Sequence, residues 1–223
     1  MGVSGDLVRR LRERGARDSR LAVVAAPPMR PARRDRDAVR TELGVPPQSP
    51  LLLVVARLAA QKGLDVLLDA VPAIADRASE PFVAVAGDGP LRGELGARAA
   101  DEGLPVHLLG RRDDIPELLA AADLFVLPSL WEGPSLVIME ALRAGLPVVA
   151  SRVGGIPDLY SDVALLVPPG DAGALAGGVA RALGDPELAE RMRAQAKRAA
   201  EALPTEEDTL DQVLAIYGSL AGR

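Results

Sequence analysis

Short apolar runs recur along the chain. They are separated by longer segments in which apolar residues recur every three or four positions instead of standing side by side. The runs cover residues 21–25, 51–55, 82–86, 106–109, 124–127, 147–150 and 164–167. Most of them are continuously apolar rather than alternating, which is typical of strands covered on both faces of a sheet. The pattern therefore predicts seven short strands, most of them buried in a parallel sheet.

The segments between these runs have helical spacing. In residues 62–76, for example, large apolar side chains recur three or four positions apart, which gives a helix one apolar face. Further helices are expected over 90–103, 114–123 and 135–145, and from Gly170 to the end of the chain. This alternation predicts an α/β fold, namely a single Rossmann-like, doubly wound parallel sheet with extra C-terminal helices.

Composition narrows the classes of function. The chain has 223 residues, no cysteine, 2% aromatic residues and a net charge of −5. These values exclude disulfides and cysteine-bound metals, and they argue against a nucleic-acid-binding protein. The sequence contains no apolar run long enough to cross a bilayer and no signal-peptide core. We therefore expect a cytoplasmic protein.

The charge is unevenly distributed. Residues 1–40 hold 11 arginines against five acidic residues. Such a basic surface suits peripheral contact with the inner face of a membrane, or with an acidic partner. A solvated helix surface is the preferred interpretation, and the peripheral contact is the alternative.

The first candidate site residues follow the second apolar run. The segment ARLAAQKGLD places Arg57 and Lys62 after a predicted strand and shortly before a helix. Parallel sheets bind ligands at the carboxyl ends of their strands. Two cations beside the free N–H groups of a helix start form a site for a diphosphate. On this segment alone, two ordinary surface charges are an equally good interpretation.

The glycine turn GDGPLRG follows the third apolar run. Gly87 and Gly89 fit the first two positions of a dinucleotide fingerprint, but Arg92 stands where the third glycine belongs. The turn therefore favours tight packing, and a nicotinamide oxidoreductase is poorly supported.

Two glutamates bracket the stretch EGPSLVIME, which begins at Glu132 and ends at Glu140. Glu132 is expected in a loop and Glu140 about a turn and a half into the following helix. Gly133 lets the backbone approach a ligand closely, and the N–H groups of the helix start favour an anion. Carboxylates that accept from sugar hydroxyls beside a phosphate site suit a sugar nucleotide. The alternatives are a helix-start acid for Glu132 and a solvated helix face for Glu140.

Several segments together resemble one family. ARLAAQKG, AADLFVLPS, EGPSLVIMEALRAGLPVVAS, GGIPDLY and LLVPPGD occur in that order, and they are similar to the donor-binding domain of the GT-B retaining glycosyltransferases, specifically glycosyltransferase family 4. The resemblance covers nearly the whole chain. It implies that residues 46–203 are a nucleotide-sugar-binding domain, the C-terminal half of a GT-B fold. Residues 1–45 resemble a remnant of the N-terminal domain and the hinge, and residues 204–223 a helix that returns towards that domain.

The resemblance also implies roles for individual residues of a hexosyltransferase. The implied catalytic residues are Glu132, which would bind hydroxyls of the transferred sugar, and Arg57 and Lys62, which would hold the diphosphate leaving group. Glu140 would bind the ribose hydroxyls. Further substrate contacts would come from the turn before the helix and from a segment beside the nucleobase, namely Gly133, Pro134, Ser135, Leu136, Arg111, Arg112 and Ile115. No metal is expected, because the cationic side chains would stabilise the departing diphosphate, and no cofactor is expected, because the NDP-sugar donor is a substrate.

The chain also departs from the family pattern. Ala56 replaces a usual glycine, and Pro134 and Ser135 replace a bulky residue followed by glycine. The resemblance implies that the acceptor domain of the family lies outside this sequence, and it leaves the acceptor unidentified. The chain would then be either a fragment of a longer protein or a half-enzyme with a separate N-terminal-domain chain as its partner, and we expect little transfer by the chain alone. The alternative function is a non-catalytic nucleotide-sugar-binding or interaction module.

Three other features receive structural interpretations. Asp35 and Asp37 match a DxD metal motif, but they follow a Pro/Arg-rich linker instead of ending an apolar strand. His107, the only histidine, lies within a predicted strand. Trp131 is expected to pack under the loop of Glu132 rather than to line a sugar pocket.

Overall fold

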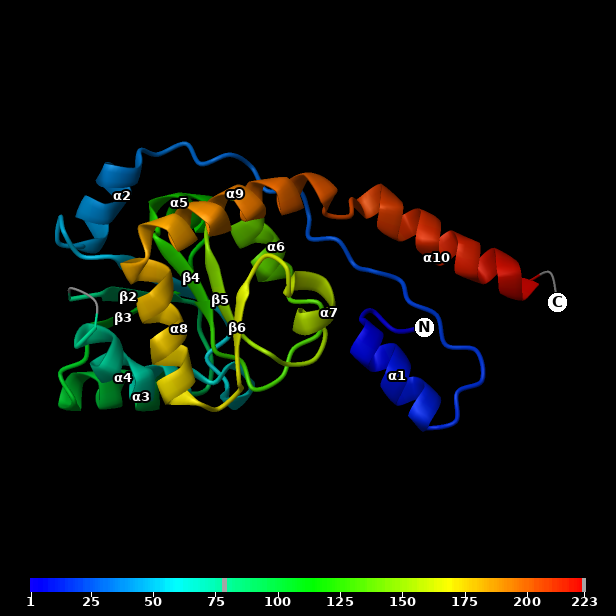
Figure 1. The fold of residues 1–223 in the computed structure, drawn as a ribbon, viewed down its shortest axis with the longest axis horizontal. Coiled ribbons are helices and arrows are strands. Elements are labelled where there is room, and N and C mark those ends of the chain that lie inside the picture. Colours follow the sequence, from blue (N-terminus) through cyan, green and yellow to red (C-terminus); the bar gives the residue numbers. More distant parts are fainter. Residues whose placement is uncertain (78–79, 222–223) are drawn as a thin grey trace.

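The computed structural model describes residues 1–77 and 80–221. Its centre is a six-stranded sheet in the order β3-β2-β1-β4-β5-β6, in which every pair of neighbours is parallel. Figure 1 shows this sheet between layers of helices. The strands are β1 (Leu51–Val55), β2 (Phe82–Ala86), β3 (Val106–Gly110), β4 (Leu124–Leu127), β5 (Val148–Ser151) and β6 (Leu165–Val167).

Alternate side chains of the central strands enter two separate cores. Leu51 and Leu53 of β1 contribute to one core, and Leu52 and Val54 contribute to the other. This double burial explains why the strands read as continuous apolar runs. The first core is closed by α2 (Arg36–Leu43), α5 (Ile115–Ala121), α6 (Leu136–Arg143), α7 (Ile156–Tyr160) and α9 (Pro186–Ala202), and the second mainly by α3 (Leu64–Ala75), α4 (Arg92–Asp101) and α8 (Ala172–Gly184).

The structure confirms the predicted fold class and six of the seven predicted strands. The prediction of a strand over residues 21–25 is wrong, because only Leu21 forms an isolated bridge, to Gly2. The backbone N–H groups of Val23 and Ala25 donate instead to side chains of α10 (Glu206–Ala221), at 3.1 Å to Gln212 and 3.1 Å to Thr209. The run is apolar because it is half-buried beside a helix, not because it pairs with another strand.

Helices α1 (Gly5–Glu13) and α10 lie at one end of the molecule, away from the sheet (Figure 1). Helix α10 leaves Leu210, Leu214 and Tyr217 more than half exposed. Within residues 1–77 and 80–221, none of the helices has the length and apolar character needed to cross a membrane. The domain boundaries expected from the resemblance stay predictions.

Candidate functional site

The strand order places the two most informative loops side by side. Strands β1 and β4 are neighbours, so the loops that leave their carboxyl ends meet at one edge of the sheet. The backbone N–H of Leu130 donates to the carbonyl oxygen of Gln61 at 2.8 Å, and Gln61 Nε2 donates to the carbonyl of Trp131 at 3.0 Å. Gly63 has a φ of +60°, and a Cβ there would overlap the carbonyl oxygen of Pro128. The close approach of these loops therefore depends on a glycine.

Lys62 and Glu132 form an ion pair between these loops. Their side chains are only 19% and 7% exposed, respectively. The hydroxyl of Ser129 donates to the same Glu132 carboxylate oxygen at 2.7 Å, and Ser129 is fully buried. The carboxylate is therefore fixed by two donors and oriented before any ligand arrives. Ser129 lies in the quoted motif AADLFVLPS, but its role was not predicted.

Arg57 lies at the same edge and is exposed. Within the residues that the structure describes, it makes no ion pair, so its charge is available to a ligand. The glycine turn of residues 87–89 packs against this loop, because a Cβ on Gly87 or on Gly89 would overlap the carbonyl oxygen of Ala56 or Leu58. The two glycines thus have a packing role, as the incomplete fingerprint indicated.

A third loop, after β5, completes the surroundings of Glu132. Gly154 has a φ of +53°, and a Cβ there would overlap the carbonyl oxygen of Glu132. A Cβ on Gly155 would lie 2.9 Å from the carbonyl oxygen of Gly133. The two glycines of the motif GGIPDLY therefore let the loop after β5 pack directly against the loop that carries Glu132.

Helix α6 begins in the same region. Its N-cap is Ser135, whose side chain makes no capping hydrogen bond, and the first N–H groups of a helix have no intrahelical acceptor. These groups and the helix dipole favour an anion at this position. Pro134 precedes the cap and has no N–H to contribute.

Glu140 lies on α6 and is half-buried. Burial raises the pKa of its carboxyl, and the nearby charge of Arg143 acts in the opposite direction. Among the described residues, the carboxylate of Glu140 has no hydrogen-bond or ion-pair partner. A half-buried carboxylate without a protein donor can accept hydrogen bonds from a ligand.

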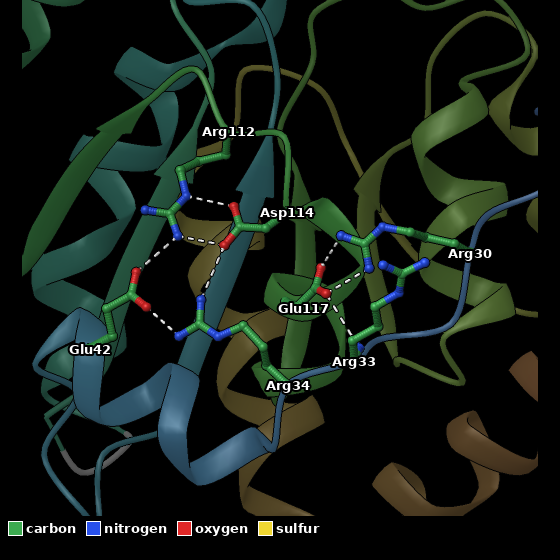
Figure 2. A network of polar contacts seen from close by, with 7 residues as sticks. All are labelled: Arg30, Arg33, Arg34, Glu42, Arg112, Asp114 and Glu117. Atoms are coloured by element: carbon green, nitrogen blue, oxygen red, sulfur yellow. Dashed lines mark hydrogen bonds and ion pairs between the residues drawn. The ribbon is translucent and has the colours of Figure 1, made fainter.

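The segment predicted to lie beside a nucleobase divides into residues with different surroundings. Arg111 is 88% exposed and 4.0 Å from Asp113, whereas Ile115 packs against the first core. Arg112 instead donates two hydrogen bonds to Asp114, at 2.7 and 2.6 Å, and a third to Glu42 at 3.2 Å. Figure 2 shows the Arg112 side chain held in this network next to α2.

The same network continues towards the linker before α2 (Figure 2). Arg34 pairs with both Glu42 and Asp114. Next to it, Arg30 donates two hydrogen bonds to Glu117 of α5, at 2.6 and 2.8 Å. Glu117 is only 3% exposed, and its hydrogen bonds to Arg30 lower the pKa of its carboxyl to about 2. These contacts bind the linker to α5 and to Asp114, the residue before it.

The pair of Arg30 and Glu117 predicts a pH-dependent contribution to stability. Because the folded chain holds the pKa of Glu117 far below its ordinary value, the stabilisation is present above the ordinary carboxyl range and is lost as the pH falls towards 2. We expect Glu117→Gln to destabilise the chain at pH 7, and this difference from the wild type should shrink between pH 5 and pH 3. Urea unfolding at several pH values measures the effect. Glu102→Gln, which alters an exposed ion pair with Arg98, is the control, and a pH-independent difference for Glu117→Gln would contradict the prediction.

Other sequence candidates have structural roles. Asp35 is the N-cap of α2 and accepts from the backbone N–H groups of Asp37 and Ala38, at 2.8 and 3.3 Å. His107 stacks on Phe82 with ring centroids 3.9 Å apart. In the described parts of the chain, no three His, Cys, Asp or Glu side chains gather as a metal site. The expectation that Trp131 packs under its loop is wrong, because Trp131 is 61% exposed.

The chain matches a family model described as glycosyl transferases group 1 over residues 35–199. It is 33% identical over 208 residues to the alpha-D-kanosaminyltransferase of Streptomyces kanamyceticus, covering 89% of this chain and 53% of that protein. It is also 33% identical over 195 residues to the D-inositol 3-phosphate glycosyltransferase of Jonesia denitrificans, covering 82% and 46% of the two chains. The chain thus spans about half the length of these curated relatives.

The fold is shared with solved structures. The crystal structure of Anabaena Alr3699/HepE in complex with UDP and glucose superposes with a TM-score of 0.80 at 25% identity, covering 100% of this chain and 62% of that one. The crystal structure of WaaG, a glycosyltransferase involved in lipopolysaccharide biosynthesis, superposes with a TM-score of 0.71 at 26% identity, covering 84% and 54%.

Proposed function

The chain belongs to the glycosyl transferases group 1, and we propose that it is the part of a retaining glycosyltransferase that binds the nucleoside diphosphate sugar donor. The observation that supports this best is the fixed ion pair of Lys62 and Glu132, which stands beside the free helix start of α6 at the carboxyl ends of β1 and β4. The UDP and glucose in the similar HepE structure agree with such a donor.

Each group has a chemical task in this proposal. Arg57, Lys62 and the first amides of α6 hold the diphosphate, and Glu132 accepts hydrogen bonds from the sugar. Transfer breaks the bond between the sugar C1 and the diphosphate oxygen, and the electron pair leaves with the diphosphate. The acceptor hydroxyl forms the new bond to C1, and its proton passes to the departing diphosphate oxygen. The cations stabilise the negative charge that develops on the leaving group, so that the protein itself supplies the electrostatic stabilisation.

Glu140 is assigned to the ribose of the donor, and its contribution can be measured. We expect one of UDP, GDP or ADP to bind in a calorimetric titration and NAD not to bind. Glu140→Ala should weaken the binding of that diphosphate about tenfold or more, because hydrogen bonds to a charged acceptor are lost. It should leave the affinity for the 2′,3′-dideoxy analogue unchanged.

Burial raises the pKa of the Glu140 carboxyl. The diphosphate affinity of the wild-type chain should therefore begin to fall on acidification at a higher pH than an ordinary carboxyl would give.

The control for this titration is Glu94→Ala, which removes an exposed carboxylate on α4 and should change neither affinity. If no nucleoside diphosphate binds the wild-type chain, the donor-site proposal is wrong. If Glu140→Ala weakens both the ribo and dideoxy ligands equally, the ribose assignment is wrong.

Pro134 removes a backbone N–H at the start of α6, where the proposal places a phosphate. This departure favours a second candidate, a nucleotide-sugar-binding or interaction module without transfer activity. Both candidates predict nucleotide binding. A transfer assay with a nucleotide sugar and a panel of acceptors separates them, because turnover by the isolated chain would exclude the second candidate.

A further inference from the structure

Ser135 carries two unusual features at once. Its hydroxyl is the only side-chain oxygen or nitrogen in residues 1–77 and 80–221 that is buried without a hydrogen-bond partner. The residue is also the only non-glycine with positive φ, at 38°, in the same part of the chain. An unsatisfied buried hydroxyl lowers the free energy of unfolding by about 1–3 kcal/mol. Serine at this position therefore destabilises the fold.

The position of Ser135 links this hydroxyl to the proposed donor site. As the N-cap of α6, it places its Cβ at the start of the helix, yet its side chain does not turn back to the first-turn amides. Serine has three staggered χ1 positions, so rotation about one bond moves the hydroxyl across the helix start without moving the backbone. The preceding Pro134 has no N–H, and a hydroxyl donor is therefore the nearest substitute for the missing amide.

A second residue holds this turn in place. The single O–H of Tyr160 is shared between two carbonyl oxygens, that of Pro134 at 2.6 Å and that of Ser135 at 3.2 Å. Tyr160 is 1% exposed and comes from α7, after β5. This shared hydrogen bond joins two consecutive carbonyls to one buried ring, and it holds the left-handed conformation that Ser135 would otherwise avoid.

This inference rests on the proposed donor site. We propose that the Ser135 hydroxyl donates a hydrogen bond to the terminal phosphate of the nucleoside diphosphate. Tyr160 is then the positioning residue that holds the Pro134–Ser135 turn in the conformation this contact needs. Ser135 then replaces the backbone donor that Pro134 cannot supply. A hydroxyl donor to a charged phosphate oxygen makes a stronger bond than a neutral pair. This explains both why the hydroxyl has no partner within the protein and why the turn is held in its unfavourable conformation.

Four variants test the proposal in the whole chain, by calorimetric titration with the diphosphate that binds among UDP, GDP and ADP, and with its monophosphate. Ser135→Ala should weaken the diphosphate about tenfold or more and leave the monophosphate within about twofold, since only the terminal phosphate loses a donor. Ser135→Gly should behave in the same way. Tyr160→Phe should weaken the diphosphate by a similar factor, and Ser135→Ala/Tyr160→Phe should be no weaker than the poorer single variant, since both act on one contact.

Stability separates a ligand contact from a structural one. Removing a buried, unpaired hydroxyl should leave the urea midpoint of Ser135→Ala unchanged or higher, and Ser135→Gly should gain more because glycine tolerates positive φ. Lower diphosphate affinity without lower stability supports the proposal.

Three results would overturn it. If Ser135→Ala keeps its diphosphate affinity while the wild type binds, the inference fails and the donor site stands. Equal losses for the diphosphate and the monophosphate would also defeat it, because the contact would then not be to the terminal phosphate. If the wild type binds none of the three diphosphates, the donor site itself fails, and this inference fails with it.

Discussion

Replacing Gly154 by alanine is expected to destabilise the chain by about 3 kcal/mol or more and to abolish nucleoside diphosphate binding. Two effects add at this position. The φ of +53° is unfavourable for any residue with a Cβ, and that Cβ would overlap the backbone carbonyl oxygen of Glu132. A backbone atom cannot rotate away as the end of a flexible side chain can, so the loop of Glu132 must move.

The movement would reach the chemistry directly. The Glu132 carboxylate is held by Lys62 and by the Ser129 hydroxyl, and both contacts depend on where the backbone of this loop lies. Displacing it separates the two sides of the candidate site, although residue 154 makes no contact with a ligand in the proposal. Urea unfolding and calorimetric titration with UDP, GDP and ADP measure the two effects separately.

Gly103→Ala is a matched control. Gly103 has a φ of +61°, but a Cβ there meets nothing within 4 Å. It therefore carries the conformational penalty of about 1 kcal/mol without the steric overlap. Equal destabilisation by the two substitutions would mean that Gly154 matters only for its backbone angle, and the supporting role of its loop would be wrong.

The sequence predicted the sheet well because both faces of its strands are buried. Continuous apolar runs such as 51–55 and 82–86 are characteristic of that environment. Each of the six predicted runs that follow residue 50 is a strand of the sheet in the structure. The run at 21–25 has the same local composition, but its amides bond to side chains of α10. An apolar run indicates that a segment is buried. Whether it pairs with another strand or lies beside a helix depends on the tertiary fold, which local composition does not show.

The candidate site was predicted in part for a related reason. Lys62 and Glu132 could be placed at one edge of the sheet, because residues that end parallel strands share an edge. Their pairing could not be predicted, since it requires β1 and β4 to be neighbours. Tyr160 is a clearer case, because its hydroxyl acts on carbonyls about 25 residues earlier in the chain, and nothing in the local sequence indicates that contact.

Arg112 shows a further limit of prediction from sequence, because a residue expected to contact a ligand contacts protein carboxylates instead. Its position suits a ligand contact, but the nearby carboxylates of Asp114 and Glu42 hold its side chain next to α2. Charge alone did not distinguish it from Arg111, which is 88% exposed. Whether an arginine faces a ligand or a protein carboxylate depends on residues that are distant in the sequence.

Lys62→Met is expected to destabilise the chain and to remove nucleotide binding, and a second substitution should repair only the first of these defects. Without Lys62, the 7% exposed carboxylate of Glu132 keeps the Ser129 hydroxyl as its one donor among the residues that the structure describes. An unpaired buried charge costs about 3 kcal/mol or more. The affinity for the diphosphate that binds should fall about 100-fold, because a charge-assisted contact worth roughly 3 kcal/mol is lost.

The double variant Lys62→Met/Glu132→Gln separates the two roles of the pair. A neutral amide beside a methionine leaves no buried charge, so urea unfolding should return close to the wild-type midpoint. Diphosphate binding should stay lost, because no cation has been restored at the site. If binding recovers together with stability, Lys62 acts by holding the loop and not by contacting phosphate. If neither recovers, the pair contributes to the fold in a way that its charges do not explain. Recovery of stability alone would mean that the charge of Lys62 serves the ligand, and that the fold tolerates it only because Glu132 lies opposite.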